Sequence, residues 1–309
     1  MIGRLIKKIS IKFNSLITFG LLLFFFRTLF DTGFIWSKGY AFLASSYGTR
    51  FNVLLGTEKL MGPLIFKIAY KKNVQSYWIK MGSDKSGVRC NLRYFAEYIL
   101  PYQKKPFILY TSDGDRIVPK HVDKKVFKLI SEHPMLETWY AQNLAKTQLN
   151  SSKLSFIPIG LDLHTRPLQA LKNCRHVSTP ALSKTLRVVC DCLINQTNPD
   201  RKEFRLKLPV KAPLCFLDKY IPNPDLVELY RASTHVLSLA GNGPDCHRTW
   251  EAISCGCAVV LPSNLDLKLP KIDCFVFFDD PVELLDINTA YRFREVPHIA
   301  LKYDFWVKL

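Results

Sequence analysis

The sequence predicts an α/β protein with two parallel-sheet domains. Short apolar runs alternate with segments of helical periodicity along most of the chain, and strands separated by helical segments favour a parallel sheet. The run at 186–193, LRVVCDCL, is almost continuously apolar, which is typical of a central strand buried on both faces. With 309 residues, 48% of them hydrophobic and 22% charged, the chain can bury a core in about two domains of ordinary size.

The first domain is expected at 37–178 and the second at 179–309, joined through a polar, irregular stretch at 163–184. The strands predicted before this linker are 51–55, 74–79, 107–110, 136–141 and 154–158, and the helices are 92–100 and 120–131. The strands predicted after it are 186–193, 214–217, 235–239, 257–261 and 274–278. Four helices are predicted after it. The first starts at Asn198-Pro199, the second spans 224–232, the third spans 245–255 and ends at Gly256, and the fourth starts at 279–281.

The stretch from Ser238 to Pro262, SLAGNGPDCHRTWEAISCGCAVVLP, indicates a strand, a glycine-rich turn, a helix and a second strand. Gly241 and Gly243 would allow positive φ and close backbone approach, and the helix that follows presents unpaired N–H groups and a partial positive charge. Arg248 lies in the first helical turn and Glu251 three residues on, so both project from one face. A diphosphate bonded to a polyol fits this pair, because a guanidinium binds phosphate oxygens and a carboxylate accepts hydrogen bonds from hydroxyls. The same arrangement also occurs in α/β domains that hold no ligand.

The string GNGPDCHRTWEAISCGCAVVLPSN resembles the nucleotide-sugar signature of exostosin-like GT-B glycosyltransferases. Two further stretches agree with that family in order: WYAQN followed by IPIGLD, at 139–143 and 157–162, and INQTNPDR at 194–201. The resemblance implies two Rossmann-like domains that face a cleft, and transfer of a hexosyl or pentosyl group from a nucleotide sugar to a glycan or glycoconjugate acceptor. The nucleotide sugar is then a substrate, and no cofactor is expected. Because proteins of this fold often pack a C-terminal helix on the first domain, the aromatic residues of the tail at 288–309 are expected in the core.

The resemblance also assigns the candidate site residues to the two domains. The second domain would bind the donor, and the residues expected there are Asn198, Arg201, Gly241, Asn242, Gly243, Asp245, Cys246, His247, Arg248 and Glu251. The first domain would bind the acceptor through residues at strand ends that are also ordinary turn formers: Gln142, Asn143, Gly160 and Asp162.

A general base for the acceptor hydroxyl is expected among Asp113, Asp115 and His121, which follow a first-domain strand. The D-G-D at 113–115 also resembles the metal-binding DxD of GT-A transferases, although such a sequence after a strand is often a simple turn. No metal is expected, because arginines and a helix N-terminus can offset the charge of the diphosphate. In retaining GT-B families a second glutamate stands eight positions after the first, but Val259 occupies that position relative to Glu251, which favours inversion.

Two alternatives remain open at this point. One is a non-catalytic nucleotide-binding or glycan-binding protein on the same fold, and the other is a metal-dependent GT-A-type transferase that uses Asp113 and Asp115. A phosphate-ester enzyme on a Rossmann-like sheet is a further rival. Nine cysteines without a C-x-x-C pair do not indicate a zinc or thioredoxin-like centre, and most are expected to be reduced.

Lys and Arg outnumber Asp and Glu by 43 to 26, and the net charge of +17 favours anionic surroundings. The lysines are spread along the chain, so nucleic-acid binding is not expected. An apolar run at 13–26 follows a basic lead, which fits a signal peptide, a signal anchor or a helix in the membrane interface. A single-pass anchor within 1–36 with a cytoplasmic N-terminus is favoured, of the Golgi or ER type in a eukaryote or in the inner membrane of a bacterium.

Overall fold

The computed structural model describes residues 27–28, 30–82, 91–146, 152–165, 186–190, 198–208, 214–216, 221–285 and 298–307. The expected membrane anchor at 13–26 and the boundary at 178/179 lie outside these residues. Across the described part of the chain, no helix combines the length and the apolar character that a membrane span requires.

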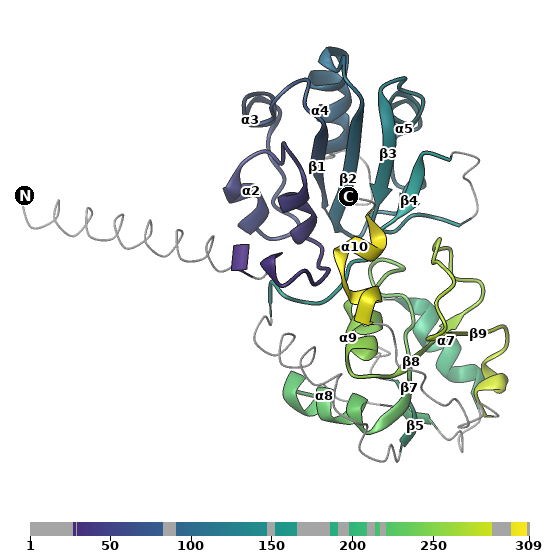
Figure 1. The fold of residues 1–309 in the computed structure, drawn as a ribbon. Coiled ribbons are helices and arrows are strands. Elements are labelled where there is room, and N and C mark those ends of the chain that lie inside the picture. The colour runs from purple at the N-terminus through teal and green to yellow at the C-terminus, as the bar shows by residue number, and fades with distance from the viewer. Residues whose placement is uncertain are drawn as a thin grey trace, which may run out of the picture.

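The first half holds a four-stranded sheet in the order β1-β2-β3-β4, with every neighbouring pair parallel. Its strands are β1 (Ser76–Gly82), β2 (Phe107–Gly114), β3 (Leu136–Ala141) and β4 (Leu154–Phe156). Two helices precede β2 and β3 in the chain: α4 (Asn91–Tyr98) and α5 (Lys124–Ser131). They pack against β1 and β3 (Figure 1). The prediction of β3 is confirmed, and β2 runs beyond the predicted 107–110 because its later residues continue the pairing with β1, and Thr111 also pairs with β3.

The second half holds a five-stranded parallel sheet in the order β6-β5-β7-β8-β9. Its strands are β5 (Leu186–Cys190), β6 (Leu214–Phe216), β7 (Ser233–Leu237), β8 (Ala258–Pro262) and β9 (Phe275–Phe278). The helices around it are α7 (Pro199–Lys207), α8 (Asn223–Arg231) and α9 (His247–Ser254). The side chain of Asn198 accepts a hydrogen bond from Asp200 N, which confirms the predicted N-cap of α7. The chain is therefore an α/β protein with two parallel sheets, as predicted.

One predicted strand is wrong. Residues 51–55 were expected to be extended, but α2 (Arg50–Leu54) is helical there. The Thr49 side chain caps its first turn by accepting a hydrogen bond from Asn52 N. Phe51 is 55% exposed, so the apolar run that suggested a strand does not form one buried face. The prediction failed because the apolar residues of a short run do not distinguish a helical turn from a strand.

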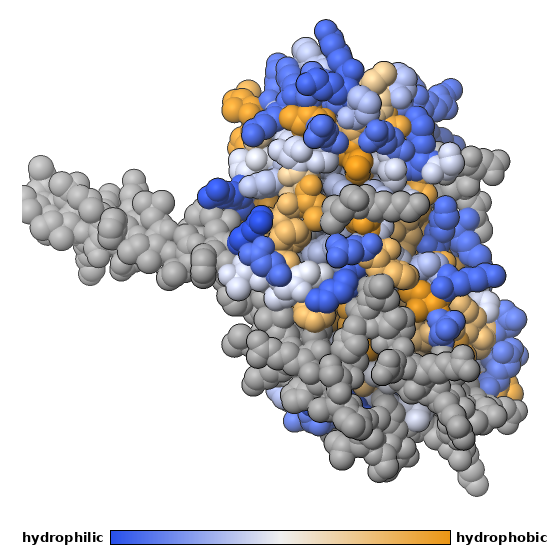
Figure 2. Space-filling view, viewed as in Figure 1, coloured by the Kyte–Doolittle hydropathy of each residue, from blue (hydrophilic) through white to orange (hydrophobic). Residues whose placement is uncertain are grey.

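Short elements complete the described structure. They are α3 (Pro63–Ala69), α10 (Tyr303–Trp306) and the 3₁₀ turns η1 (Gly39–Leu43), η2 (Leu100–Tyr102), η3 (Pro281–Leu285) and η4 (His298–Leu301). On the face seen in Figure 2, hydrophobic residues reach the surface where Figure 1 draws α3. The α3 residues Leu64, Ile65 and Ile68 are 57–77% exposed.

The C-terminal tail returns to the first half and joins the two halves. Ile35 N donates to Leu301 O at 2.9 Å, so the tail is bound to the segment that precedes η1. The Trp306 ring packs edge-on against Phe156 of β4 and against Trp250 of α9, with centroid distances of 5.6 and 5.4 Å. One hydrophobic cluster contains buried residues from both sheets. Within α10, Tyr303 and Trp306 are buried as expected, but Phe305 is 41% exposed, so the expectation is wrong for that residue. The tail contacts both halves through Trp306.

Candidate functional site

The strand order of the second sheet marks the place where a ligand would bind. In an open parallel sheet, ligands bind outside the carboxyl ends of the strands where the order reverses, and here that point lies between β5 and β7. The loop at 238–246 follows β7 directly, and α7 is the next described helix after β5. The strand was predicted to end at residue 239, but β7 ends at Leu237, so residues 238 and 239 belong to the loop. This loop is therefore the candidate site.

Three of the predicted donor-binding side chains converge on this loop. Arg201 Nε donates to Ala240 O at 2.9 Å, and Arg248 Nη1 donates to Leu239 O at 3.4 Å. Asn198 Nδ2 lies 3.4 Å from the same Ala240 oxygen. The arginines come from different helices, α7 and α9. The fold thus brings two guanidinium groups to one short turn at the switch point of the sheet.

The two glycines of the loop are favoured by close contacts and not by the positive φ that was expected. Neither Gly241 nor Gly243 has a positive φ. A Cβ on Gly243 would lie 3.0 Å from Asn143 Nδ2, and a Cβ on Gly241 would lie 3.3 Å from Arg201 Nη2 and from Cys246 Sγ. Close approach of neighbouring side chains therefore accounts for these glycines. Positive φ occurs instead at Gly256, which follows the C-cap of α9 as predicted.

Asp245 joins the two halves and does not open the helix, which corrects its expected place at the helix start. Its Oδ2 accepts a hydrogen bond from Ile159 N at 2.6 Å, and its Oδ1 accepts one from Trp250 Nε1 at 2.8 Å. Burial raises the pKa of Asp245 to about 6, although both hydrogen bonds oppose this shift. Because its two oxygens bind groups of the protein, Asp245 positions the loop. Its role in donor binding stays a prediction.

The predicted acceptor-side amides also act at this junction. Gln142 Nε2 and Asn143 Nδ2 both donate to Gly114 O, at 2.8 and 3.0 Å. Asn143 Oδ1 accepts a hydrogen bond from Asp245 N at 3.1 Å. The carboxyl ends of β2 and β3 are thereby linked to the loop of the second half. The sequence predicted that these residues lie at strand ends, and the structure identifies their hydrogen-bond partners within the protein.

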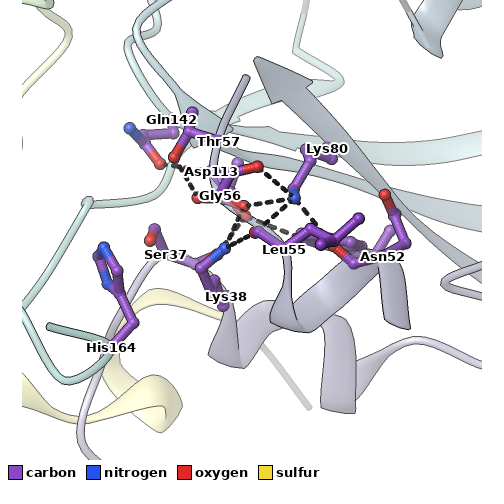
Figure 3. Close-up of polar contacts among 12 residues, drawn as sticks. Ser37, Lys38, Asn52, Leu55, Gly56, Thr57, Lys80, Asp113, Gln142 and His164 are labelled. Atoms are coloured by element: carbon purple, nitrogen blue, oxygen red, sulfur yellow. Dashed lines mark hydrogen bonds and ion pairs between the residues drawn. The ribbon is translucent and has the colours of Figure 1, made fainter. Parts of the chain in front are cut away.

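Asp113 lies in a buried cluster with two lysines (Figure 3). Its Oδ2 is 2.8 Å from Lys38 Nζ and 3.4 Å from Lys80 Nζ, and its Oδ1 accepts a hydrogen bond from Thr57 Oγ1. Burial alone would raise the pKa of Asp113, but the two lysines outweigh it and the pKa is lowered. This argues against Asp113 as a general base. It also argues against the GT-A alternative, because the carboxylate that would hold a metal is bound to two ammonium groups.

The same two lysines bind carbonyl oxygens of α2 and of the residues that follow it, up to Gly56. Lys80 Nζ donates to the carbonyl oxygens of Asn52, Leu55 and Gly56 at 2.8–3.1 Å, and Lys38 Nζ donates to Leu55 O at 2.8 Å. Burial lowers the pKa of Lys80 to about 8, although Asp113 opposes this shift. The sequence analysis missed both lysines. A signal for Lys80 was available, because it is the one charged residue of the otherwise apolar strand SYWIKMG.

The other two candidate bases occupy the turn after β2. Asp115 is partly buried, and its N–H donates to Gly82 O at 3.2 Å. His121 Nδ1 accepts a hydrogen bond from Ile117 N at 3.1 Å, so a local turn occupies that lone pair. Both residues stay candidates for the base.

The remaining loop residues lie as follows. Asn242 is exposed, and Glu251 is partly buried on α9, one turn after Arg248. Cys246 is the N-cap of α9, and its Sγ is 3.8 Å from Leu239 O and from Gly243 O.

Two predicted residues, Asp162 and His247, meet where the halves join. His247 begins α9, and its Nδ1 is 2.7 Å from the carbonyl oxygen of Gly160. The ring of His164 lies 5.5 Å from the ring of His247, and its Nδ1 is 3.3 Å from Asp162 Oδ1. Burial lowers the pKa of His164 to about 4, against the effect of Asp162, so the ring is neutral near pH 7. His164 was not predicted from the sequence, although a D-x-H pair at 162–164, shortly after a predicted strand, was a readable signal.

No protein-family model matches the chain, and no curated protein matches it either. The functional interpretation therefore depends on the geometry of the site and on the residues of the loop.

Proposed function

We propose that the chain is a glycosyltransferase of GT-B architecture that moves a sugar from a nucleotide-sugar donor to a glycan or glycoconjugate acceptor. Its main support is the convergence of Arg201 and Arg248 on the turn at 239–241, at the switch point of the second sheet. The resemblance of this loop to the exostosin-like signature supports the same assignment. The donor would bind at the second half and the acceptor at the first.

The proposed chemistry needs positive charge where the diphosphate leaves. Cleavage of the bond between sugar and phosphate develops negative charge on the diphosphate, and preorganised donors aimed at that charge lower the barrier. Arg201, Arg248 and the N-terminus of α9 would supply these donors. Glu251, on the same helix as Arg248, would accept hydrogen bonds from the hydroxyls of the donor. The diphosphate would then require no divalent ion, and we propose inversion at the anomeric carbon with Asp115 or His121 as the base.

We also propose that the protein works at a membrane. The apolar run at 13–26 with its basic lead is the first support. The second is α3, where Leu64, Ile65 and Ile68 are exposed beside Lys67. Apolar side chains flanked by lysine favour contact with anionic lipid headgroups.

A second function class has one observation in its favour. Asp113, the first candidate for a base, is bound by two lysines and has a lowered pKa, which suits a protein that binds nucleotide or glycan without turning it over. Binding and turnover must therefore be measured separately.

The test begins with titration of UDP, GDP and their sugars into the purified chain, followed by incubation with radiolabelled donors and acceptors. Arg201→Ala should weaken nucleotide binding by about 1.5–3 kcal/mol, the range for a charge-assisted hydrogen bond. Lys202→Ala is the matched control, because it removes one positive charge from an exposed neighbouring residue of α7. Equal binding by both variants would overturn the phosphate site. Binding without transfer or hydrolysis would favour the non-catalytic function.

A further inference from the structure

We propose that Asp162, His164 and His247 form a binding site for one divalent transition-metal ion, with Zn²⁺ as the best match, at the junction of the two halves. Each residue offers one potential ligand atom, and these atoms all lie within 4.8 Å of one another. Asp162 and His164 follow β4 of the first sheet, whereas His247 begins α9 of the second half. The proposal does not depend on the glycosyltransferase function.

The orientation of His247 matches that of a metal ligand. Its Nδ1 lies 2.7 Å from Gly160 O, and a carbonyl oxygen can only accept a hydrogen bond, so Nδ1 carries the proton. In the neutral ring, Nε2 then carries a lone pair. Histidines that bind metal commonly donate their other ring N–H to a backbone carbonyl or carboxylate, which fixes the ring and its tautomer.

His164 supplies an independent observation. Its Nδ1 is buried and has no hydrogen-bond partner within the described part of the chain, although it lies 3.3 Å from Asp162 Oδ1. A buried polar nitrogen without a partner is rare in folded proteins. Asp162 Oδ1 also accepts a hydrogen bond from Thr165 N at 3.0 Å, which holds the carboxylate in place. A cation beside these groups would satisfy both the imidazole lone pair and the carboxylate.

The kinds of ligand select the class of metal. Two imidazoles and one carboxylate suit Zn²⁺ and related transition metals, whereas Mg²⁺ and Ca²⁺ prefer several oxygen ligands. Zn²⁺ bonds of about 2.0–2.1 Å place tetrahedral ligand atoms about 3.4 Å apart, so the three side chains would move closer together on binding. Lys38 lies near this cluster (Figure 3), but its ammonium group is paired with Asp113 at 2.8 Å.

An ion at this site would tie the two halves together beside the candidate loop. It would be bound through imidazole nitrogen, and it is therefore distinct from the Mg²⁺ or Mn²⁺ that carries a diphosphate in GT-A transferases. Three protein ligands also leave one position of a tetrahedral ion open.

The first test is competition for Zn²⁺ between the metal-free full chain and a chromophoric chelator. We expect one ion per chain, and His164→Gln and His247→Gln should each lower the affinity by roughly 100-fold, since even partners of metal ligands contribute 10- to 100-fold. His133→Gln is the matched control, because His133 precedes β3 and caps Met135 N at the other end of the sheet. Its affinity should equal that of the unmodified chain.

The second test separates this site from the cysteines, which also bind Zn²⁺. Co²⁺ at the proposed site should give a spectrum of nitrogen and oxygen ligands without thiolate charge-transfer bands, and Asp162→Asn should alter that spectrum. Zn²⁺ should raise the Tm of the unmodified chain and of His133→Gln, but not that of His164→Gln. An unmodified chain that binds no Zn²⁺, a Co²⁺ spectrum with thiolate bands, or folded His164 and His247 variants that bind as tightly as the unmodified chain would each overturn the proposal. These measurements use no nucleotide, so their failure leaves the proposed function intact.

Discussion

Asp113→Asn should destabilise the fold strongly, because it removes the one carboxylate from a buried cluster that contains two ammonium groups. Lys38 and Lys80 are only 3% and 0% exposed. In the variant, both buried ammonium groups would be left with uncharged oxygen atoms as their hydrogen-bond partners. Breaking a buried ion pair by removing one partner typically costs about 3–5 kcal/mol, and we expect a loss of that size in the free energy of unfolding. The measurement is urea denaturation near pH 7, followed by intrinsic fluorescence.

The control for this prediction is Glu97→Gln on α4. Glu97 pairs with Arg93 at 2.7 Å, but their side chains are 40% and 60% exposed, so water screens the pair. This variant should change stability far less than Asp113→Asn. If the two variants unfold at similar urea concentrations, the buried cluster does not stabilise the fold as argued. If Asp113→Asn retains full stability but loses turnover, Asp113 is a catalytic base after all.

The dependence of stability on pH gives a second check of the same cluster. The pKa of Lys80 is lowered from 10.5 to about 8 in the folded chain. Between these pH values the unfolded chain therefore binds more protons than the folded chain. The contribution of Lys80 to the free energy of unfolding rises as the pH increases from about 8 to 10.5. The folded pKa of Asp113 is lowered below 3.8, so its contribution is present above that value and is lost as pH falls through the folded pKa. In Asp113→Asn, the loss of stability that Asp113 causes at acid pH should disappear. The difference in stability between this variant and the unmodified chain should also become smaller at alkaline pH, where the lysines can lose their charge.

Three further predictions follow from the proposed function. Arg248→Ala should weaken nucleotide-sugar binding by about 1.5–3 kcal/mol in calorimetric titrations, and unchanged affinity of the folded variant would contradict the phosphate site. Turnover should not rise when Mg²⁺ or Mn²⁺ is added, and Asp115→Asn should create no metal-dependent defect; activation by either ion would favour a metal-carried diphosphate. The full chain should sediment with membranes after carbonate extraction, whereas a chain that begins at Arg27 should stay in the supernatant and still bind donor. The shortened chain retains Ile35, whose N–H donates to Leu301 O, so this contact of the fold is preserved. If the shortened chain still sediments, the membrane attachment lies elsewhere in the chain.

The sequence by itself determined most of the regular elements, because their signals are local. The alternation of apolar runs and helical segments predicted the parallel sheets, and β3 was placed at its observed bounds. Asn198-Pro199 predicted the start of α7, and Gly256 predicted the end of α9, because capping depends on residues within one helical turn. The local rule failed at α2, where Thr49 caps a turn that the apolar pattern could not distinguish from a strand.

The candidate site was predicted in part. The sequence placed Asn198, Arg201 and Arg248 near a phosphate-sized turn, since each lies at the start of a helix that follows a strand. The sequence could not tell that the Asn143 side chain approaches Gly243 closely, because these residues are far apart in the chain. The sequence also could not tell that Ile159 N and Trp250 Nε1 donate hydrogen bonds to the carboxylate of Asp245.

Only the tertiary structure decided which charges are buried and what they bind. Asp113, Lys38 and Lys80 come from segments well separated in sequence, and each would be solvated and ordinary in isolation. His164 and His247 likewise meet only because the second half packs against the first. Periodicity and capping act over a few residues, whereas the pKa of a buried group and the position of a ligand atom depend on contacts made when distant segments fold together.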